Sequence, residues 1–221
     1  AELAARTIRE RLGIDRADIG LVLGSGWSAG ADHLGEIIGS LPLAEIPGFS
    51  APVVTGHGGD LLAIRVSTGR IAVVLTGRTH LYEGRGVEPV VHGVRTVAAL
   101  GAGTMVLTNG CGGLNPSWEP GTVVAIRDHI NLTGKSPIEG ARFVDLTDLY
   151  SPRLRDVARS IDSSLGDAGW VHQHELGRQA IGYYLQTSGV VSGFGAAASR
   201  LSNETFSRLA RRIWSSSSPP S

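Results

Sequence analysis

The chain has 221 residues, of which 18% are charged, and its 20 Lys and Arg residues balance its 20 Asp and Glu residues. A zero net charge provides no overall field to attract nucleic acid or an anionic membrane, so we expect neither as a partner. No apolar run approaches the roughly 20 residues that cross a bilayer, and residues 1–15 lack the apolar core of a signal peptide. The single cysteine, Cys111, excludes an intrachain disulfide and favours a cytoplasmic location.

In chain order, segments with helix and strand patterns alternate. Helices are predicted over 2–12, 27–34, 90–100 and 152–165, and strands over 19–23, 36–41, 61–66, 70–75, 104–108 and 123–132. The alternation indicates one α/β domain over residues 1–221, built as a three-layer α/β/α sandwich with a mixed central sheet.

Three of the predicted strands run directly into small and polar residues, in segments 23–26, 75–78 and 107–110. If these strands are parallel neighbours, their loops meet at the edge of the sheet where α/β proteins bind ligands. Glycine loops expose backbone N–H groups that can hold an oxyanion. Ser25 adds a hydroxyl and Arg78 a positive charge, so the sequence predicts a site for an anion of about the size of phosphate.

The segment 71–84 carries the densest group of polar candidates. A buried strand is followed by Arg78, His80 and Tyr82 at alternate positions. In extended backbone this alternation would place all three side chains on one face. A guanidinium, a second donor and an aromatic edge facing one way suit an anion joined to a ring-shaped group.

Six motifs with these residues occur in order along the chain. They are Gly24-Ser25-Gly26, Gly56-His57-x-Gly59, Gly77-Arg78-x-His80-x-Tyr82-Glu83-Gly84, Thr108-Asn109-x-x-Gly112-Gly113-Leu114-Asn115-Pro116, Arg127-Asp128-His129-Ile130-Asn131-Leu132 and Arg142-Phe143-x-Asp145. The set resembles the trimeric purine nucleoside phosphorylases over roughly residues 2–165. The resemblance implies a phosphorylase-type sandwich that cleaves the N-glycosidic bond of purine (deoxy)ribonucleosides with phosphate, giving the free base and (deoxy)ribose 1-phosphate.

The resemblance also implies which residues bind phosphate. Carried over position by position, they are Ser25, His57, Arg78, His80 and the backbone N–H of Gly110. Two of them, Arg78 and His80, are the expected catalytic residues. Inorganic phosphate is the co-substrate, and neither a cofactor nor a metal is expected.

Three further residues are implied to bind the nucleoside: Tyr82, Asn109 and Phe143. Tyr82 would contact the ribose. Phe143 would reach into the ribose pocket of a neighbouring subunit, because the family implied by the resemblance forms homotrimers.

The resemblance ends near Leu165. Residues 166–221 contain no match to the Glu and Asn with which the family binds the purine, so this region is divergent or misread. His172 and His174 are two positions apart with no third ligand, a poor metal pair. Gly110-Cys111 replaces the family's Ala-Ala, which is harmless if Gly110 acts through its N–H. For the sequence as written, we expect weak or absent turnover.

Three other functions fit parts of the sequence. The pattern Gly24-x-Gly26-x-x-Ala29 matches a dinucleotide-binding Rossmann protein, but the next apolar run ends without the acidic residue that an NAD site needs. Phosphorolysis of methylthioadenosine stays open, because the deciding base contacts fall in residues 166–221. An inactive phosphate- or nucleoside-binding protein is the third alternative, and a phosphorolysis assay separates it from an enzyme.

Overall fold

The computed structural model describes residues 1–24, 27–50, 59–110, 113, 115–119 and 121–172. The helices are α1 (Glu2–Leu12), α2 (Val87–Ala99) and α3 (Pro152–Ile161), with short 3₁₀ helices η1 (Ser28–His33), η2 (Leu43–Glu45) and η3 (Leu81–Glu83). The strands are β1 (Ile19–Val22), β2 (Glu36–Pro42), β3 (Asp60–Arg65), β4 (Ile71–Leu75), β5 (Thr104–Leu107), β6 (Val124–Asn131) and β7 (Gly166–His172).

A five-stranded mixed sheet in the order β2-β3-β4-β1-β5 forms the centre of the fold. Strand β1 runs parallel to both of its neighbours, with Val22 opposite Leu75 of β4 on one side and Leu107 of β5 on the other. Strands β2 and β3 are antiparallel and extend the sheet beyond β4. The carboxyl ends of β1, β4 and β5 therefore lie at one edge, which confirms that the three loops predicted to meet there are neighbours.

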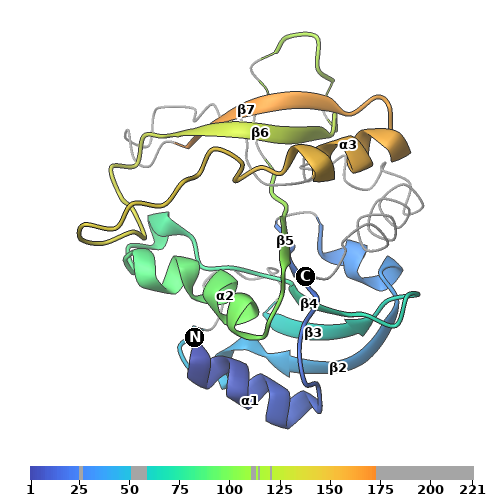
Figure 1. Cartoon of the computed structure of the whole chain (residues 1–221), viewed down its shortest axis with the longest axis vertical. Coiled ribbons are helices and arrows are strands. Elements are labelled where there is room, and N and C mark those ends of the chain that lie inside the picture. The colour runs from blue at the N-terminus through green and yellow to red at the C-terminus, as the bar shows by residue number, and fades with distance from the viewer. Residues whose placement is uncertain (25–26, 51–58, 111–112, 114, 120, 173–221) are drawn as a thin grey trace.

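Helices α1 and α2 cover one face of this sheet (Figure 1). Ile8 of α1 and Val97 of α2 are fully buried in one cluster with Val73 of β4. Gly20 of β1 lets α2 approach closely, because a Cβ at that position would lie 2.3 Å from Cγ1 of Val97. This side of the core thus depends on a strand position without a side chain.

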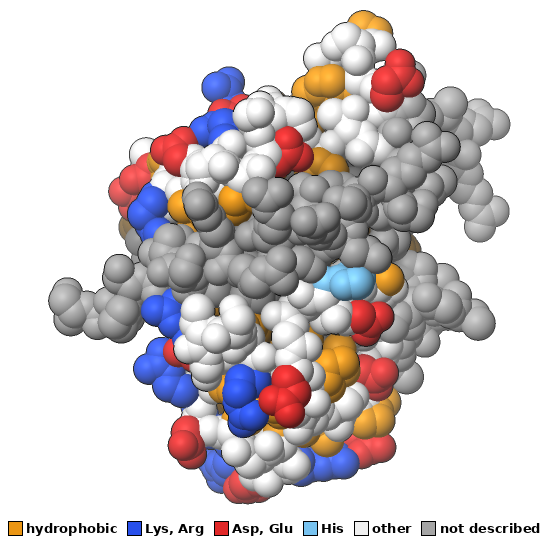
Figure 2. All heavy atoms as spheres, turned by 90° about the vertical axis from the view of Figure 1, so that its right-hand side faces the viewer, with side chains coloured by type: hydrophobic (Ala, Val, Ile, Leu, Met, Phe, Trp, Pro, Cys, Tyr) orange, Lys and Arg blue, Asp and Glu red, His pale blue; other side chains and the backbone are white. Residues whose placement is uncertain are grey.

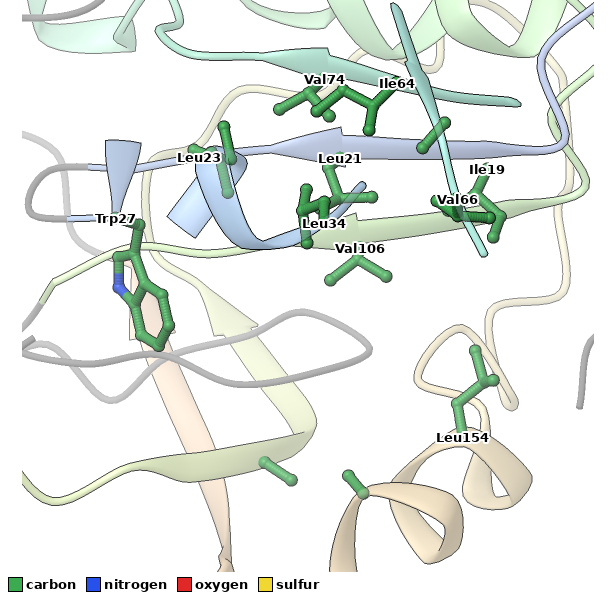
Figure 3. Packing of buried hydrophobic residues seen from close by; sticks show 14 of the residues in the cluster. Ile19, Leu21, Leu23, Trp27, Leu34, Ile64, Val66, Val74, Val106 and Leu154 are labelled. Atoms are coloured by element: carbon green, nitrogen blue, oxygen red, sulfur yellow. The ribbon is translucent and has the colours of Figure 1, made fainter. Parts of the chain in front are cut away.

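The other face of the sheet packs on η1, β6 and α3. Leu21 of β1 and Val106 of β5 share a buried cluster with Leu34, which follows η1, with Ala125 of β6 and with Leu154 of α3. Figure 3 shows Leu21, Leu34 and Val106 gathered on this side of the sheet. The molecule is a three-layer α/β/α sandwich with a mixed central sheet, as predicted.

Some predicted elements differ from the structure in length, and one was not predicted. The helix predicted over 27–34 is present as a shorter 3₁₀ helix over Ser28–His33. The helix predicted over 152–165 ends at Ile161, because the Asp162 carboxylate accepts the N–H of Ser164 at 2.9 Å and makes a local turn. Strand β7 is absent from the prediction, and it pairs in parallel with β6 to form a separate two-stranded sheet.

The described surface carries charges of both signs. On the face in Figure 2, Lys and Arg side chains (blue) are intermixed with Asp and Glu side chains (red). This mixture agrees with the zero net charge of the sequence. In the described part of the chain, no helix combines the length and the apolar character needed to span a membrane.

Candidate functional site

The ends of β1, β4 and β5 are joined by hydrogen bonds beyond the last strand residues. The N–H of Leu23 donates to the carbonyl of Leu75 at 2.8 Å. The N–H of Gly24 donates to the hydroxyl of Thr108 at 3.0 Å, and Nη1 of Arg78 donates to the carbonyl of Thr108 at 3.4 Å. The three chain segments that leave the sheet here therefore converge on one place, the strand-end cluster formed by Gly24, Arg78 and Thr108.

Arg78 is the positive charge of this cluster. Its side chain is largely buried, and burial lowers the pKa of the guanidinium below its ordinary value, while the Tyr82 phenol raises it by a smaller amount. Among the residues that the structure describes, no carboxylate forms an ion pair with it. A guanidinium has five N–H donors, and the hydrogen bond to Thr108 uses one. An anion is the group that would satisfy both the charge and the remaining donors.

Gly24 has to be glycine at this position. A Cβ built there would lie 2.4 Å from the carbonyl oxygen of Thr108, 2.6 Å from Nη1 of Arg78 and 2.7 Å from Cα of Asn109. The glycine loop therefore serves close packing around the guanidinium. Since the N–H of Gly24 already donates to Thr108, that particular N–H is not available to an anion.

His80 and Tyr82 lie on the same segment as Arg78, but the backbone does not stay extended as the alternation predicts. After His80 it turns into η3 (Leu81–Glu83), and the Glu83 carboxylate accepts the N–H of His80 at 2.7 Å to hold this turn. The two rings nevertheless stack, with centroids 4.7 Å apart and planes 14° from parallel. They form a flat, polar-edged surface next to Arg78, with the Tyr82 side chain exposed.

The end of β5 supplies two more of the predicted residues. The side-chain oxygen Oδ1 of Asn109 is buried and accepts no hydrogen bond from any residue that the structure describes. The next residue, Gly110, is exposed at the same edge of the sheet. This edge thus offers a lone acceptor beside the donors of Arg78, a combination that suits a ligand with both oxyanion and hydroxyl groups.

Phe143 is not part of the strand-end cluster. It lies between β6 and α3 with 97% of its side chain exposed, so it contributes nothing to the site of its own chain. Ser25 and His57, which the family resemblance assigns to phosphate, lie outside the described residues. Within the described ranges, no group of three or more His, Cys, Asp or Glu is placed to hold a metal ion.

Comparison with known proteins places this arrangement in a family. The family model described as the phosphorylase superfamily matches residues 18–206. The chain belongs to the phosphorylase superfamily. A purine nucleoside phosphorylase from Cellulomonas sp is 56% identical over 169 residues, covering 75% of this chain and 60% of that protein. The purine nucleoside phosphorylase from Mycobacterium tuberculosis is 48% identical over 167 residues, covering 76% and 62%.

Solved structures agree with this membership of the superfamily. A crystal structure of a purine nucleoside phosphorylase in complex with ribose-1-phosphate matches with a TM-score of 0.78 and 25% identity, over 95% of each chain. The aligned part of this chain spans about 60% of the length of the curated relatives that it matches.

Sequence reasoning missed two residues that hold the strand-end cluster and the turn beside it. Thr108 falls within one of the six motifs, but its bonds to Gly24 and Val22 depend on the pairing of β1 with β5. Glu83 also falls within a motif, and the spacing His80-x-x-Glu83 is the one that a capping interaction uses. That spacing could have indicated the bond of Glu83 to the His80 N–H.

A first prediction concerns the buried charge. Replacing Arg78 by Met should leave the ligand-free protein as stable as wild type or more stable by about 1 kcal/mol, because an uncompensated charge leaves the interior. The same change should abolish stabilisation by phosphate, which at about 100 times its Kd adds about 2.7 kcal/mol to a protein that binds it. Thermal unfolding with and without phosphate measures both effects.

Arg65→Met is the matched control, because Arg65 is an exposed arginine paired with Glu36 at 3.1 Å. Its response to phosphate should equal that of wild type. An undiminished rise in Tm with phosphate in Arg78→Met would contradict the role given to Arg78.

Proposed function

We propose that this chain is a purine nucleoside phosphorylase of the trimeric branch, which uses inorganic phosphate to cleave the N-glycosidic bond of purine (deoxy)ribonucleosides. The observation that carries the proposal is the largely buried Arg78 at the meeting point of three parallel strand ends, without a counter-ion among the described residues. The names of the curated relatives support it, as does a structural relative that was solved in complex with ribose-1-phosphate.

The proposed reaction matches the chemistry of the cluster. Phosphate attacks the anomeric carbon of the sugar, the bond to the purine nitrogen breaks, and the products are the free base and (deoxy)ribose 1-phosphate. Phosphate is already an anionic nucleophile, so it needs positioning more than deprotonation, and Arg78 would provide this. The bound anion would also stabilise the positive charge that develops on the sugar in an oxocarbenium-like transition state.

The other site residues have proposed roles in the same reaction. Ser25, His57, His80 and the N–H of Gly110 would complete the phosphate site. The stacked ring of Tyr82 and the unpaired oxygen of Asn109 would face the sugar, since a ribose presents both an apolar face and hydroxyl donors. No cofactor beyond the co-substrate phosphate is proposed. We further propose a single domain over residues 1–221, with 166–221 divergent, and a cytoplasmic location.

A second candidate is an inactive phosphate- or nucleoside-binding protein. It is favoured by the lack, in residues 166–221, of a match to the family's purine-binding Glu and Asn. A purine leaves poorly as an anion unless a group protonates it or hydrogen-bonds to it. Phosphorolysis of methylthioadenosine is the remaining alternative within the same chemistry.

A phosphorolysis assay tests the proposed function. The chain should release base from inosine only when phosphate is present, at a low rate because the usual purine-binding groups are missing, and more slowly from methylthioadenosine. Arg78→Ala should lower kcat/KM for phosphate by about ten- to a hundredfold, since a charged hydrogen bond contributes roughly 1.5–3 kcal/mol. Phosphate binding without any release of base would favour the inactive binder.

The proposed trimer can be tested separately. Phe143, Val144, Leu146 and Leu149 are exposed apolar residues of one segment between β6 and α3, as expected of a surface that another subunit covers. Light scattering at micromolar concentration should give a mass close to three chains. Phe143→Ser should weaken the assembly, and a monomeric wild-type protein would refute the proposal.

A further inference from the structure

The side chain of Thr108 links two strands at the point where their ladder ends. Thr108 follows β5 directly and only 4% of it is exposed. Its hydroxyl accepts the N–H of Gly24 at 3.0 Å and donates to the carbonyl of Val22 at 3.2 Å. Its backbone N–H also donates to the Val22 carbonyl, at 2.9 Å. One residue beside β5 thus holds the chain that leaves β1 at two points, Val22 and Gly24.

The Thr108 hydroxyl provides a hydrogen-bond acceptor for a backbone N–H just after β1. The pairing of β1 with β5 ends at Val22 and Leu107, and beyond it no strand residue supplies an acceptor to the buried Gly24 N–H. A buried N–H without an acceptor costs free energy comparable to a lost hydrogen bond. The Thr108 side chain supplies that acceptor, and so connects Gly24 to the end of β5 beyond the last pair of strand residues.

The same residue also holds Arg78. While the Thr108 hydroxyl binds Gly24, the Thr108 carbonyl accepts Nη1 of Arg78 at 3.4 Å. A Cβ on Gly24 would lie within 2.7 Å of Arg78 and Asn109 atoms, so the Gly24 backbone packs directly on both. A shift of Gly24 or Thr108 would therefore move the guanidinium.

We propose that Thr108 is a positioning residue of the anion site, which acts through Gly24 and Arg78 and does not touch the anion itself. The inference rests on the proposed function in that the anion is taken to be phosphate. The hydroxyl of Thr108, and not the volume of its side chain, fixes the direction in which Arg78 presents its donors.

The chain contains a matched control for this claim. Thr96 of α2 is also fully buried, but its hydroxyl has no hydrogen-bond partner in the described part of the chain. Thr→Val exchanges a hydroxyl for a methyl group of similar volume. At Thr108 the exchange removes two hydrogen bonds, and at Thr96 it removes none. Thr108→Ser retains the hydroxyl and loses a methyl group, so it should restore the function that Thr108→Val loses.

The test measures binding of inorganic phosphate by calorimetry for wild type, Thr108→Val, Thr108→Ser and Thr96→Val. Thr108→Val should raise the Kd for phosphate about tenfold, and Thr108→Ser and Thr96→Val should stay within about threefold of wild type. Where turnover is measurable, Thr108→Val should raise KM for phosphate and leave KM for the nucleoside nearly unchanged. Hydrogen exchange at the Arg78 Nη–H groups, one of which donates to the Thr108 carbonyl, should become faster by NMR in Thr108→Val alone.

Wild-type affinity for phosphate in Thr108→Val, or equal rises in the KM of both substrates, would overturn the positioning role. A Thr108→Ser variant as impaired as Thr108→Val would also overturn it, because side-chain volume would then be the cause. Failure of wild type to bind phosphate would instead refute the proposed function. In that case unchanged Arg78 Nη–H exchange in Thr108→Val would still count against the positioning role, and faster exchange would support it.

Discussion

The structure around the site depends on one unfavourable feature, a largely buried guanidinium that has no carboxylate partner in the described residues. Burial lowers the pKa of Arg78, which means that its surroundings disfavour the charge the site requires. Such a group persists only where the rest of the fold holds it in place. The central sheet provides this, because β1, β4 and β5 are parallel and in register up to their last residues, with β1 fully buried between its two neighbours.

Position in the sheet explains why the loops after these strands differ in composition. The loop after β1 needs glycine, since any side chain at Gly24 would meet Arg78 and the β5 backbone. The residue after β5 needs a hydroxyl, since Thr108 satisfies the Gly24 N–H. The segment after β4 supplies the charge and then turns sharply at η3, which brings the rings of His80 and Tyr82 together. Each loop thus meets a different requirement of one site.

Much of the fold follows from local patterns in the sequence. Short apolar runs predicted β1, β3, β4 and β5, and the small residues after three of the strands correctly predicted that their loops meet at one edge. The predictions failed where tertiary packing determines where a helix ends or whether a segment forms a strand. The helix predicted over 152–165 ends early at Ile161, and β7, which pairs with β6, was not predicted. A strand over 166–172 has no strong pattern of its own.

The candidate site was predictable only in part, for a similar reason. Residue type and position after a strand indicated Arg78 and Asn109, whereas the role of Thr108 depends on which strand lies beside β5. The expectation that Arg78, His80 and Tyr82 face one way assumed an extended backbone; the backbone turns after His80, where Glu83 caps η3, and yet the rings of His80 and Tyr82 stack. The assignment of Phe143 to the site rests on the family resemblance alone, because Phe143 is exposed in its own chain.

The central claim is that the strand-end cluster binds a tetrahedral oxyanion, and anomalous diffraction tests it most directly. Crystals grown without phosphate or sulfate would be soaked in arsenate, a phosphate analogue whose arsenic atom can be located from its anomalous signal. We expect an arsenic peak within hydrogen-bonding reach of the Arg78 guanidinium, on the side where Asn109 and Gly110 leave β5. Arsenic peaks confined to other parts of the molecule, with none at Arg78 at saturating arsenate, would contradict the claim.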